Sequence, residues 1–171
     1  MKARLLAIIC GRAGWSDYED IVKDIFKDSL FPKYITEPLT QEVSPLPDFR
    51  RDILLPLTLE GNFWHYVSVV YKGSIIIVEC KNYCDTITPD EVHSTLKYLT
   101  RPGVADVAFI VSRLGPNPQA FQLAIDYYKT MNKLFIFLND TNLNDLIDLA
   151  GRPDEATNYL RDIYNGQKAR M

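Results

Sequence analysis

Apolar residues along the chain follow two spacings, one typical of helices and one typical of buried strands. Tyr18, Ile21 and Val22 begin a series spaced three and four apart that continues to Leu30, which predicts one apolar face of a helix. Ser16 or Asp17 is expected to cap this helix. Short apolar runs bounded by turn residues predict strands, and longer stretches with helical spacing predict further helices. The expected strands are 52–57, 74–80, 105–112 and 134–138, and the expected helices are 89–99, 117–131, 142–150 and 153–165.

Two stretches are less regular. Residues 34–50 contain Pro38, Pro45 and Pro47 and are expected to be extended. Residues 63–71 fit helical spacing but contain three valines, so a helix and a strand both stay open for this stretch. Strands and helices then alternate toward the end of the chain. This alternation is typical of an α/β sandwich whose sheet is covered by helices on both faces.

The chain has 171 residues, the length of one ordinary domain. We expect an N-terminal segment over 1–14 and a single domain over 15–168. The formal net charge of −3 excludes a uniformly basic, histone-like surface, although it is compatible with a local basic patch. No apolar run approaches the roughly 20 residues of a membrane span, so no membrane association is expected.

The three cysteines are Cys10, Cys80 and Cys84. Such an odd and sparse set is typical of reduced thiols in a reducing compartment, which predicts a cytoplasmic protein. Because the chain has no pair of Cys-x-x-Cys motifs, we expect Cys80 and Cys84 to be buried, inert thiols rather than zinc ligands.

The most informative chemistry follows the apolar strand Ile75–Val78, which ends in Glu79, Cys80 and Lys81. Side chains alternate along a strand, so Glu79 and Lys81 project to the same face and Cys80 projects to the other. Ligand-binding and catalytic groups collect at the carboxyl ends of strands in α/β sheets. A Glu-x-Lys pair alone is common and is usually an ordinary ion pair.

Asp52 adds a second carboxylate at the start of another predicted strand, directly after Arg50 and Arg51. Two carboxylates can hold a hard divalent cation through oxygen. Such a cation activates water and neutralises charge on a phosphate, and a neighbouring lysine can orient that water or stabilise the transition state. This set of groups is the minimum for metal-assisted cleavage of a phosphodiester.

On these residues the chain resembles the PD-(D/E)xK nuclease superfamily, in particular its Mrr-like, restriction-endonuclease-like branch. Asp52 matches the aspartate of the motif, and Glu79-Cys80-Lys81 matches its (D/E)xK part. Asn82 and Tyr83 match a polar residue and a tyrosine that often follow the motif. Glu19, in the first predicted helix, matches a glutamate of many Mrr-like members. The order of later elements also follows the family.

The resemblance implies a restriction-endonuclease-like sandwich with a central mixed sheet and an αβββαβ core. It implies a Mg²⁺-dependent DNA endonuclease, with Mn²⁺ as a substitute, in restriction or antiphage defence. Asp52 and Glu79 would bind the metal, with Glu19 and the carbonyl of Cys80 as further ligands, and Lys81 would serve catalysis. Arg51, Asn82 and Arg113 would contact nucleic acid. A homodimer, a further recognition domain or a partner subunit would supply sequence specificity.

Three alternatives stay open at this point. Asp48 follows a literal proline, as the motif prescribes, whereas Asp52 follows Arg51; we favour Asp52 because it adjoins a predicted strand. The fold could serve as a catalytically silent module for binding or assembly. An RNA-cleaving effector would use the same active-site chemistry as a DNA endonuclease.

Overall fold

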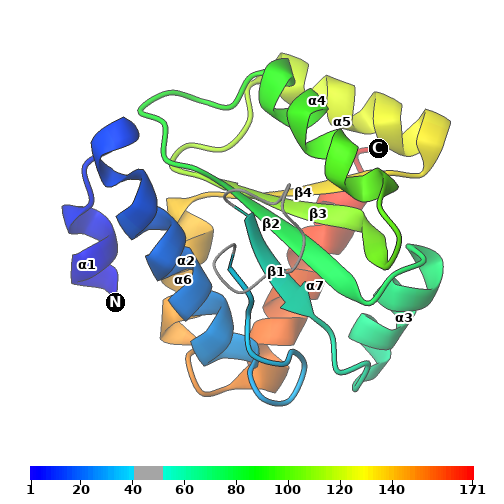
Figure 1. The fold of residues 1–171 in the computed structure, drawn as a ribbon, viewed down its shortest axis with the longest axis horizontal. Helices are drawn as coiled ribbons and strands as arrows, with labels where there is room; N and C mark the ends of the chain where they lie inside the picture. Colours follow the sequence, from blue (N-terminus) through cyan, green and yellow to red (C-terminus); the bar gives the residue numbers. More distant parts are fainter. Residues whose placement is uncertain (41–51) are drawn as a thin grey trace.

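A four-stranded mixed sheet forms the centre of the computed structural model, which describes residues 1–40 and 52–171 (Figure 1). The strand order is β1-β2-β3-β4; β1 runs antiparallel to β2, and β2, β3 and β4 are parallel. The strands are β1 (Asp52–Pro56), β2 (Ile75–Lys81), β3 (Val104–Ser112) and β4 (Leu134–Leu138). The helices are α1 (Lys2–Ala7), α2 (Trp15–Leu30), α3 (Asn62–Val70), α4 (Pro89–Leu96), α5 (Pro118–Met131), α6 (Asp140–Asp148) and α7 (Pro153–Lys168), with short 3-10 turns η1 (Arg12–Gly14) and η2 (Lys97–Thr100).

Helices cover both faces of the sheet and create two apolar cores. Ile76 and Val78 of β2 point into the core formed with α2, α3, α6 and α7. Ile77 points into the other core, formed with α4 and α5. The predicted α/β sandwich with a sheet covered on both faces is therefore confirmed, as is the two-sided burial of the β2 run.

An additional extended segment borders β1 on its outer edge. Ile35 and Leu39 form antiparallel bridges to Leu57 and Leu54, and the amide of Thr36 donates to the carbonyl of Pro56. The extended conformation predicted from the prolines of 34–50 is therefore confirmed where the structure describes it. This segment widens the sheet beside the strand that begins at Asp52.

Two local predictions need correction or completion. Helix α2 begins at Trp15 and its N-cap position is Gly14, so Ser16 and Asp17 lie inside the first turn and do not cap the helix. The stretch 63–71, for which helix and strand were both open, forms helix α3. Its valines fit a helix because Val67 packs into the core while Val69 faces solvent.

Candidate active site at the end of strand β2

Glu79 and Lys81 form a close ion pair near the end of β2. The Lys81 Nζ lies 2.5 Å from Glu79 Oε1, and only 6% of the surface of Glu79 is exposed. The other carboxylate oxygen, Oε2, is buried and has no hydrogen-bond partner among the described residues. A buried carboxylate oxygen without a partner is rare in native proteins, because losing hydration is unfavourable for a charged group. Within the described part of the chain, Oε2 of Glu79 is therefore open to a further ligand in a desolvated environment.

The backbone register places Asp52 directly opposite Glu79 on the neighbouring antiparallel strand. Directly opposed residues of an antiparallel pair share one face of the sheet. The fold thus places Asp52 and Glu79 on adjacent strands, opposite each other. The structure does not describe the Asp52 side chain, so the sharing of one cation stays a prediction. Asp48 and Arg51 lie outside the described residues.

A pocket of about 210 Å³ opens where β2 ends and α2 begins. Glu19 lines it together with Glu79 and Lys81, because the first turn of α2 lies beside the end of β2. The structure therefore assembles five of the predicted site residues around one cavity, since Cys80 and Asn82 also line it. Its lining comprises Gly11, Arg12, Trp15, Glu19, Glu79, Cys80, Lys81, Asn82 and Tyr83.

Cys80 lies at the pocket as well, but its side chain packs against the core that contains α2 and α7. Its thiol is not part of a disulfide and is half buried, in agreement with the opposite orientation predicted for it. Metal binding by its backbone carbonyl stays a prediction.

Asn82 and Arg113 hold the N-terminal segment against the sheet. The amide of Asn82 donates to the carbonyls of Ile9 and Gly11, at 2.8 and 3.0 Å. The Arg113 guanidinium donates to the Asn82 side-chain oxygen at 2.8 Å and to the carbonyl of Ile8 at 2.6 Å. These hydrogen bonds give both side chains a structural role, and the nucleic-acid contacts predicted for them stay predictions.

Arg113 also anchors a buried polar network behind the pocket. It donates to Asp140 at 2.9 Å, and its guanidinium lies 4.5 Å from the centre of the Tyr18 ring. The Tyr18 hydroxyl donates to the other oxygen of Asp140 at 2.9 Å. Burial, and then the negative charge of Asp140, raise the pKa of Tyr18 above its ordinary value. The network fixes α2, and with it Glu19, relative to the sheet.

Cys10 and Cys84 form a disulfide, which overturns the expectation that both are reduced. Residues far apart in sequence meet here, since the amide of Gly11 also donates to the carbonyl of Asn82 at 2.5 Å. An odd count and wide spacing of cysteines cannot reveal such a long-range contact. The argument from reduced thiols to a cytoplasmic protein loses its support.

We expect a protein with Cys10→Ser and Cys84→Ser to lose about 2–4 kcal/mol of unfolding free energy, because the disulfide restricts an unfolded loop with a sequence separation of 74. Urea unfolding of the double variant and of the oxidised wild type measures the difference. Cys80→Ser is the control, since this cysteine is not part of the disulfide. Equal unfolding midpoints for the double variant and wild type would contradict a disulfide in the folded protein.

Four residues of the pocket were not identified from the sequence as site residues: Gly11, Arg12, Trp15 and Tyr83. Arg12 and Trp15 belong to the segment that is tied to the loop after β2, and Tyr83 lies in that loop. Cys10 and Cys84, which lie near these residues in sequence, are the one signal that could have shown that the residues meet in space.

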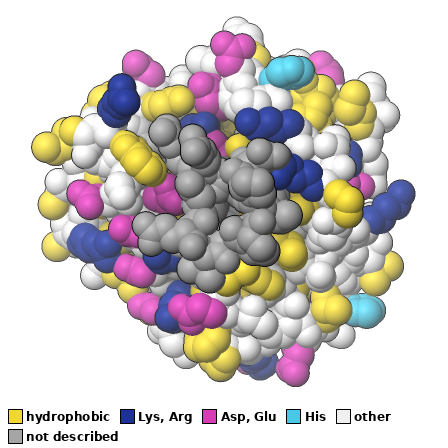
Figure 2. Space-filling view, in the orientation of Figure 1, with side chains coloured by type: hydrophobic (Ala, Val, Ile, Leu, Met, Phe, Trp, Pro, Cys, Tyr) yellow, Lys and Arg dark blue, Asp and Glu magenta, His cyan; other side chains and the backbone are white. Residues whose placement is uncertain are grey.

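Charged side chains of both signs are mixed on the face of the molecule drawn in Figure 2. Lys and Arg side chains and Asp and Glu side chains both occur on it. On this face the described residues form no continuous basic surface, in agreement with the net charge of −3.

Comparison of the chain with protein-family models, curated proteins and solved structures gives no significant match. Within residues 1–40 and 52–171, no group of three or more His, Cys, Asp or Glu side chains is arranged to hold a metal ion. The side chain of Asp52 is outside that search. No described helix is long and apolar enough to cross a bilayer.

Proposed function

We propose that this protein is a divalent-cation-dependent nuclease of restriction-endonuclease-like fold that cleaves DNA, with its active site in the Glu79 pocket. The observation that carries the proposal is the buried Oε2 of Glu79, which has no hydrogen-bond partner among the described residues and lies beside Lys81 and opposite Asp52. An ordinary structural ion pair would satisfy both oxygens of a buried carboxylate. A hard cation prefers carboxylate oxygen, so this oxygen is suited to bind a metal.

The order of the elements supports the proposed fold. Helix α2 is followed by the bridged segment that contains Ile35 and Leu39, by β1 and β2, and then by α4 and β3. With α3 taken as an addition between β1 and β2, this order corresponds to an αβββαβ core. The two acids begin and end adjacent antiparallel strands in this arrangement.

Each residue of the proposed site has a separate role. Asp52 and Glu79 would hold Mg²⁺, or Mn²⁺ in its place, and Glu19 and the Cys80 carbonyl would complete its coordination. When bound, Mg²⁺ would lower the pKa of the water that it coordinates and would neutralise negative charge on the phosphate. Lys81, held at 2.5 Å from Glu79, places an ammonium where it can orient the attacking water or contact the phosphate oxygens.

Incubation with plasmid, linear duplex and single-stranded DNA and with RNA, each with Mg²⁺, Mn²⁺ or EDTA, tests the proposal. We expect cleavage of DNA that EDTA abolishes. If only RNA is cleaved, the substrate is RNA and not DNA. An absence of cleavage of every nucleic acid with either metal would contradict the nuclease and favour the catalytically silent binding module.

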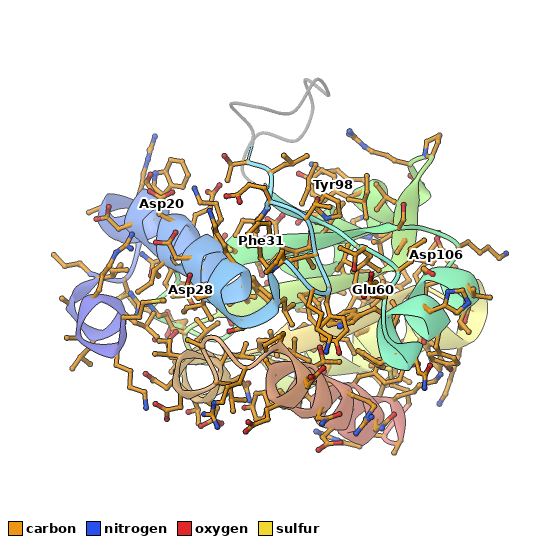
Figure 3. The ribbon with its side chains drawn as sticks, turned by 90° about the horizontal axis from the view of Figure 1, so that it is seen from below. Asp20, Asp28, Phe31, Glu60, Tyr98 and Asp106 are labelled. Carbon is orange, nitrogen blue, oxygen red and sulfur yellow. A yellow bond between two sulfur atoms is a disulfide. The ribbon has the colours of Figure 1, made fainter. Side chains whose placement is uncertain are left out.

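Glu19→Gln should weaken metal affinity or the rate of cleavage by about 10- to 100-fold, the range typical of residues that support a metal site, while the fold is retained. Titration with Mn²⁺ and initial cleavage rates measure both effects. Asp20→Asn is the matched control, because Asp20 is the next carboxylate on α2 and pairs with Lys23 on the exposed surface, where Figure 3 labels it. If Glu19→Gln binds metal and cleaves as well as the wild type does, Glu19 has no role in the site and is an ordinary residue near the start of α2.

A further inference from the structure

Two exposed aromatic side chains border the pocket that contains Glu79. Among the described residues, Trp15, Tyr66 and Tyr83 are the exposed tryptophan and tyrosines, with 39, 43 and 41% of their surfaces exposed. Trp15 and Tyr83 line the Glu79 pocket, and Tyr66 lies elsewhere, between α3 and α7. Aromatic rings exposed beside a polar pocket offer flat, apolar faces on which a nucleobase can stack.

The chain segments that carry the two rings are held together by contacts of neighbouring residues. Tyr83 lies between Asn82, whose amide donates to Ile9 and Gly11, and Cys84, which is bonded to Cys10. These contacts join the loop that contains Tyr83 to the segment that leads into Trp15. A platform that is already ordered loses less conformational entropy when a ligand binds.

Gly14, immediately before Trp15, shows how closely these segments pack. A Cβ atom at Gly14 would lie 2.1 Å from the carbonyl oxygen of Ile9 and 3.1 Å from the amide nitrogen of Asn82. No side chain fits there without a backbone shift. The position of Trp15 at the edge of the pocket is therefore fixed by the packing of the backbone before it.

The charged side chains of the protein also favour one kind of nucleic acid over another. Duplex DNA is bound chiefly through its phosphates and requires an extended basic surface. The net charge is −3, and the described residues on the face shown in Figure 2 carry charges of both signs. Of the two cations that line the pocket, Lys81 is paired with Glu79, whereas Arg12 is exposed on the same pocket as the two rings. An exposed cation with two aromatic rings suits a strand whose bases are unpaired, because the faces of paired bases are already covered by their neighbours.

We infer that the Glu79 pocket takes single-stranded DNA, with Trp15 and Tyr83 stacking on unpaired bases and Arg12 contacting a phosphate. This inference rests on the proposed function, since it names the substrate of the same site. It assigns the two aromatic residues to substrate binding and leaves the chemistry to Asp52, Glu79 and Lys81.

Binding of a labelled oligothymidylate and of a labelled hairpin duplex, followed by fluorescence anisotropy, tests the inference. The titrations are made in EDTA and again with Ca²⁺, so that affinity is measured apart from Mg²⁺-dependent cleavage. We expect wild type to prefer the single strand. Tyr83→Ala and Trp15→Ala should each weaken its binding by about 5- to 150-fold, the effect of losing one stacked base. Trp15→Phe should restore most of the affinity.

Tyr66→Ala is the matched control, because Tyr66 has nearly the same exposure as Tyr83 but lines a different pocket. It should bind the single strand as wild type does. Equal affinity of Tyr83→Ala and wild type, or a preference of wild type for the duplex, would overturn the inference. If the protein cleaves duplex DNA and shows no preference for single strands, the inference is wrong and the proposed nuclease activity stands. If it binds single strands but cleaves no nucleic acid with any divalent metal, the proposed nuclease activity is wrong and the inference about binding stands.

Discussion

Glu79→Gln should abolish detectable nuclease activity, with a loss of at least about 10²–10³-fold, and should also remove most of the affinity for Mg²⁺ or Mn²⁺. Glutamine has nearly the same shape as glutamate, but it removes the charge from the oxygen that has no partner in the described structure. A neutral amide is a far weaker ligand for a hard cation than a carboxylate. Calorimetric titration with Mn²⁺ and initial rates on single-stranded DNA measure the two losses. Asp52→Asn should behave in the same way, because the register places it opposite Glu79.

The control for this substitution is Asp106→Asn. Asp106 pairs with Lys133, and both side chains are 16% exposed, close to the 8% of Glu79 and 19% of Lys81. Figure 3 shows Asp106 on the other side of the molecule from Asp20, the neighbour of Glu19. Breaking either pair leaves a lysine without its carboxylate, so both variants should lose stability, but only Glu79→Gln should lose metal affinity. Equal metal affinity in the wild type and Glu79→Gln would contradict the assigned ligand.

Lys81→Ala should reduce the rate of cleavage by about 10²–10³-fold while metal and nucleic acid still bind. A group that stabilises charge appearing only in the transition state changes the rate and hardly changes the affinity of the ground state. Lys81→Arg should not restore the rate, because a planar guanidinium differs in size and hydration from a compact ammonium. Single-turnover rates at saturating DNA, with metal affinity measured alongside, separate the rate from binding.

Lys133→Ala is the matched control for Lys81→Ala, since it removes an equally shielded lysine from an ion pair away from the pocket. It should cleave at the wild-type rate per folded molecule. A Lys81→Ala protein that cleaves as fast as the wild type, with its metal bound, would exclude a role for this ammonium in catalysis.

The strands and helices could be predicted because a buried face of a helix or strand requires apolar residues at regular spacings in the sequence. The run Ile75–Val78 shows the strand, and the alternation of side chains along it places Glu79 and Lys81 on one face. The two residues indeed form an ion pair 2.5 Å long. Glu19 was predicted from the family resemblance, and the fold brings it to the same pocket.

The remaining features depend on contacts between distant segments, which periodicity does not encode. The disulfide of Cys10 and Cys84, and the hydrogen bonds of Asn82 and Arg113 to the N-terminal segment, arise because that segment folds back onto the end of β2. For the same reason periodicity does not show that Trp15 and Tyr83 border one pocket, and only the cysteines beside them could have indicated it. The role of Arg113 was predicted from its position after a strand, but its position beside α1 and α2 decided its contacts.

The proposed site requires Asp52 and Glu79 to share one divalent cation. A crystal structure of the wild-type protein grown with Mn²⁺, with anomalous scattering to locate the ion, would show whether they do. We expect one anomalous peak between the two carboxylates, with metal–oxygen distances of about 2.1 Å, and no such peak in Glu79→Gln crystals. An Asp52 carboxylate directed away from an empty Glu79 site at saturating Mn²⁺ would exclude a shared cation.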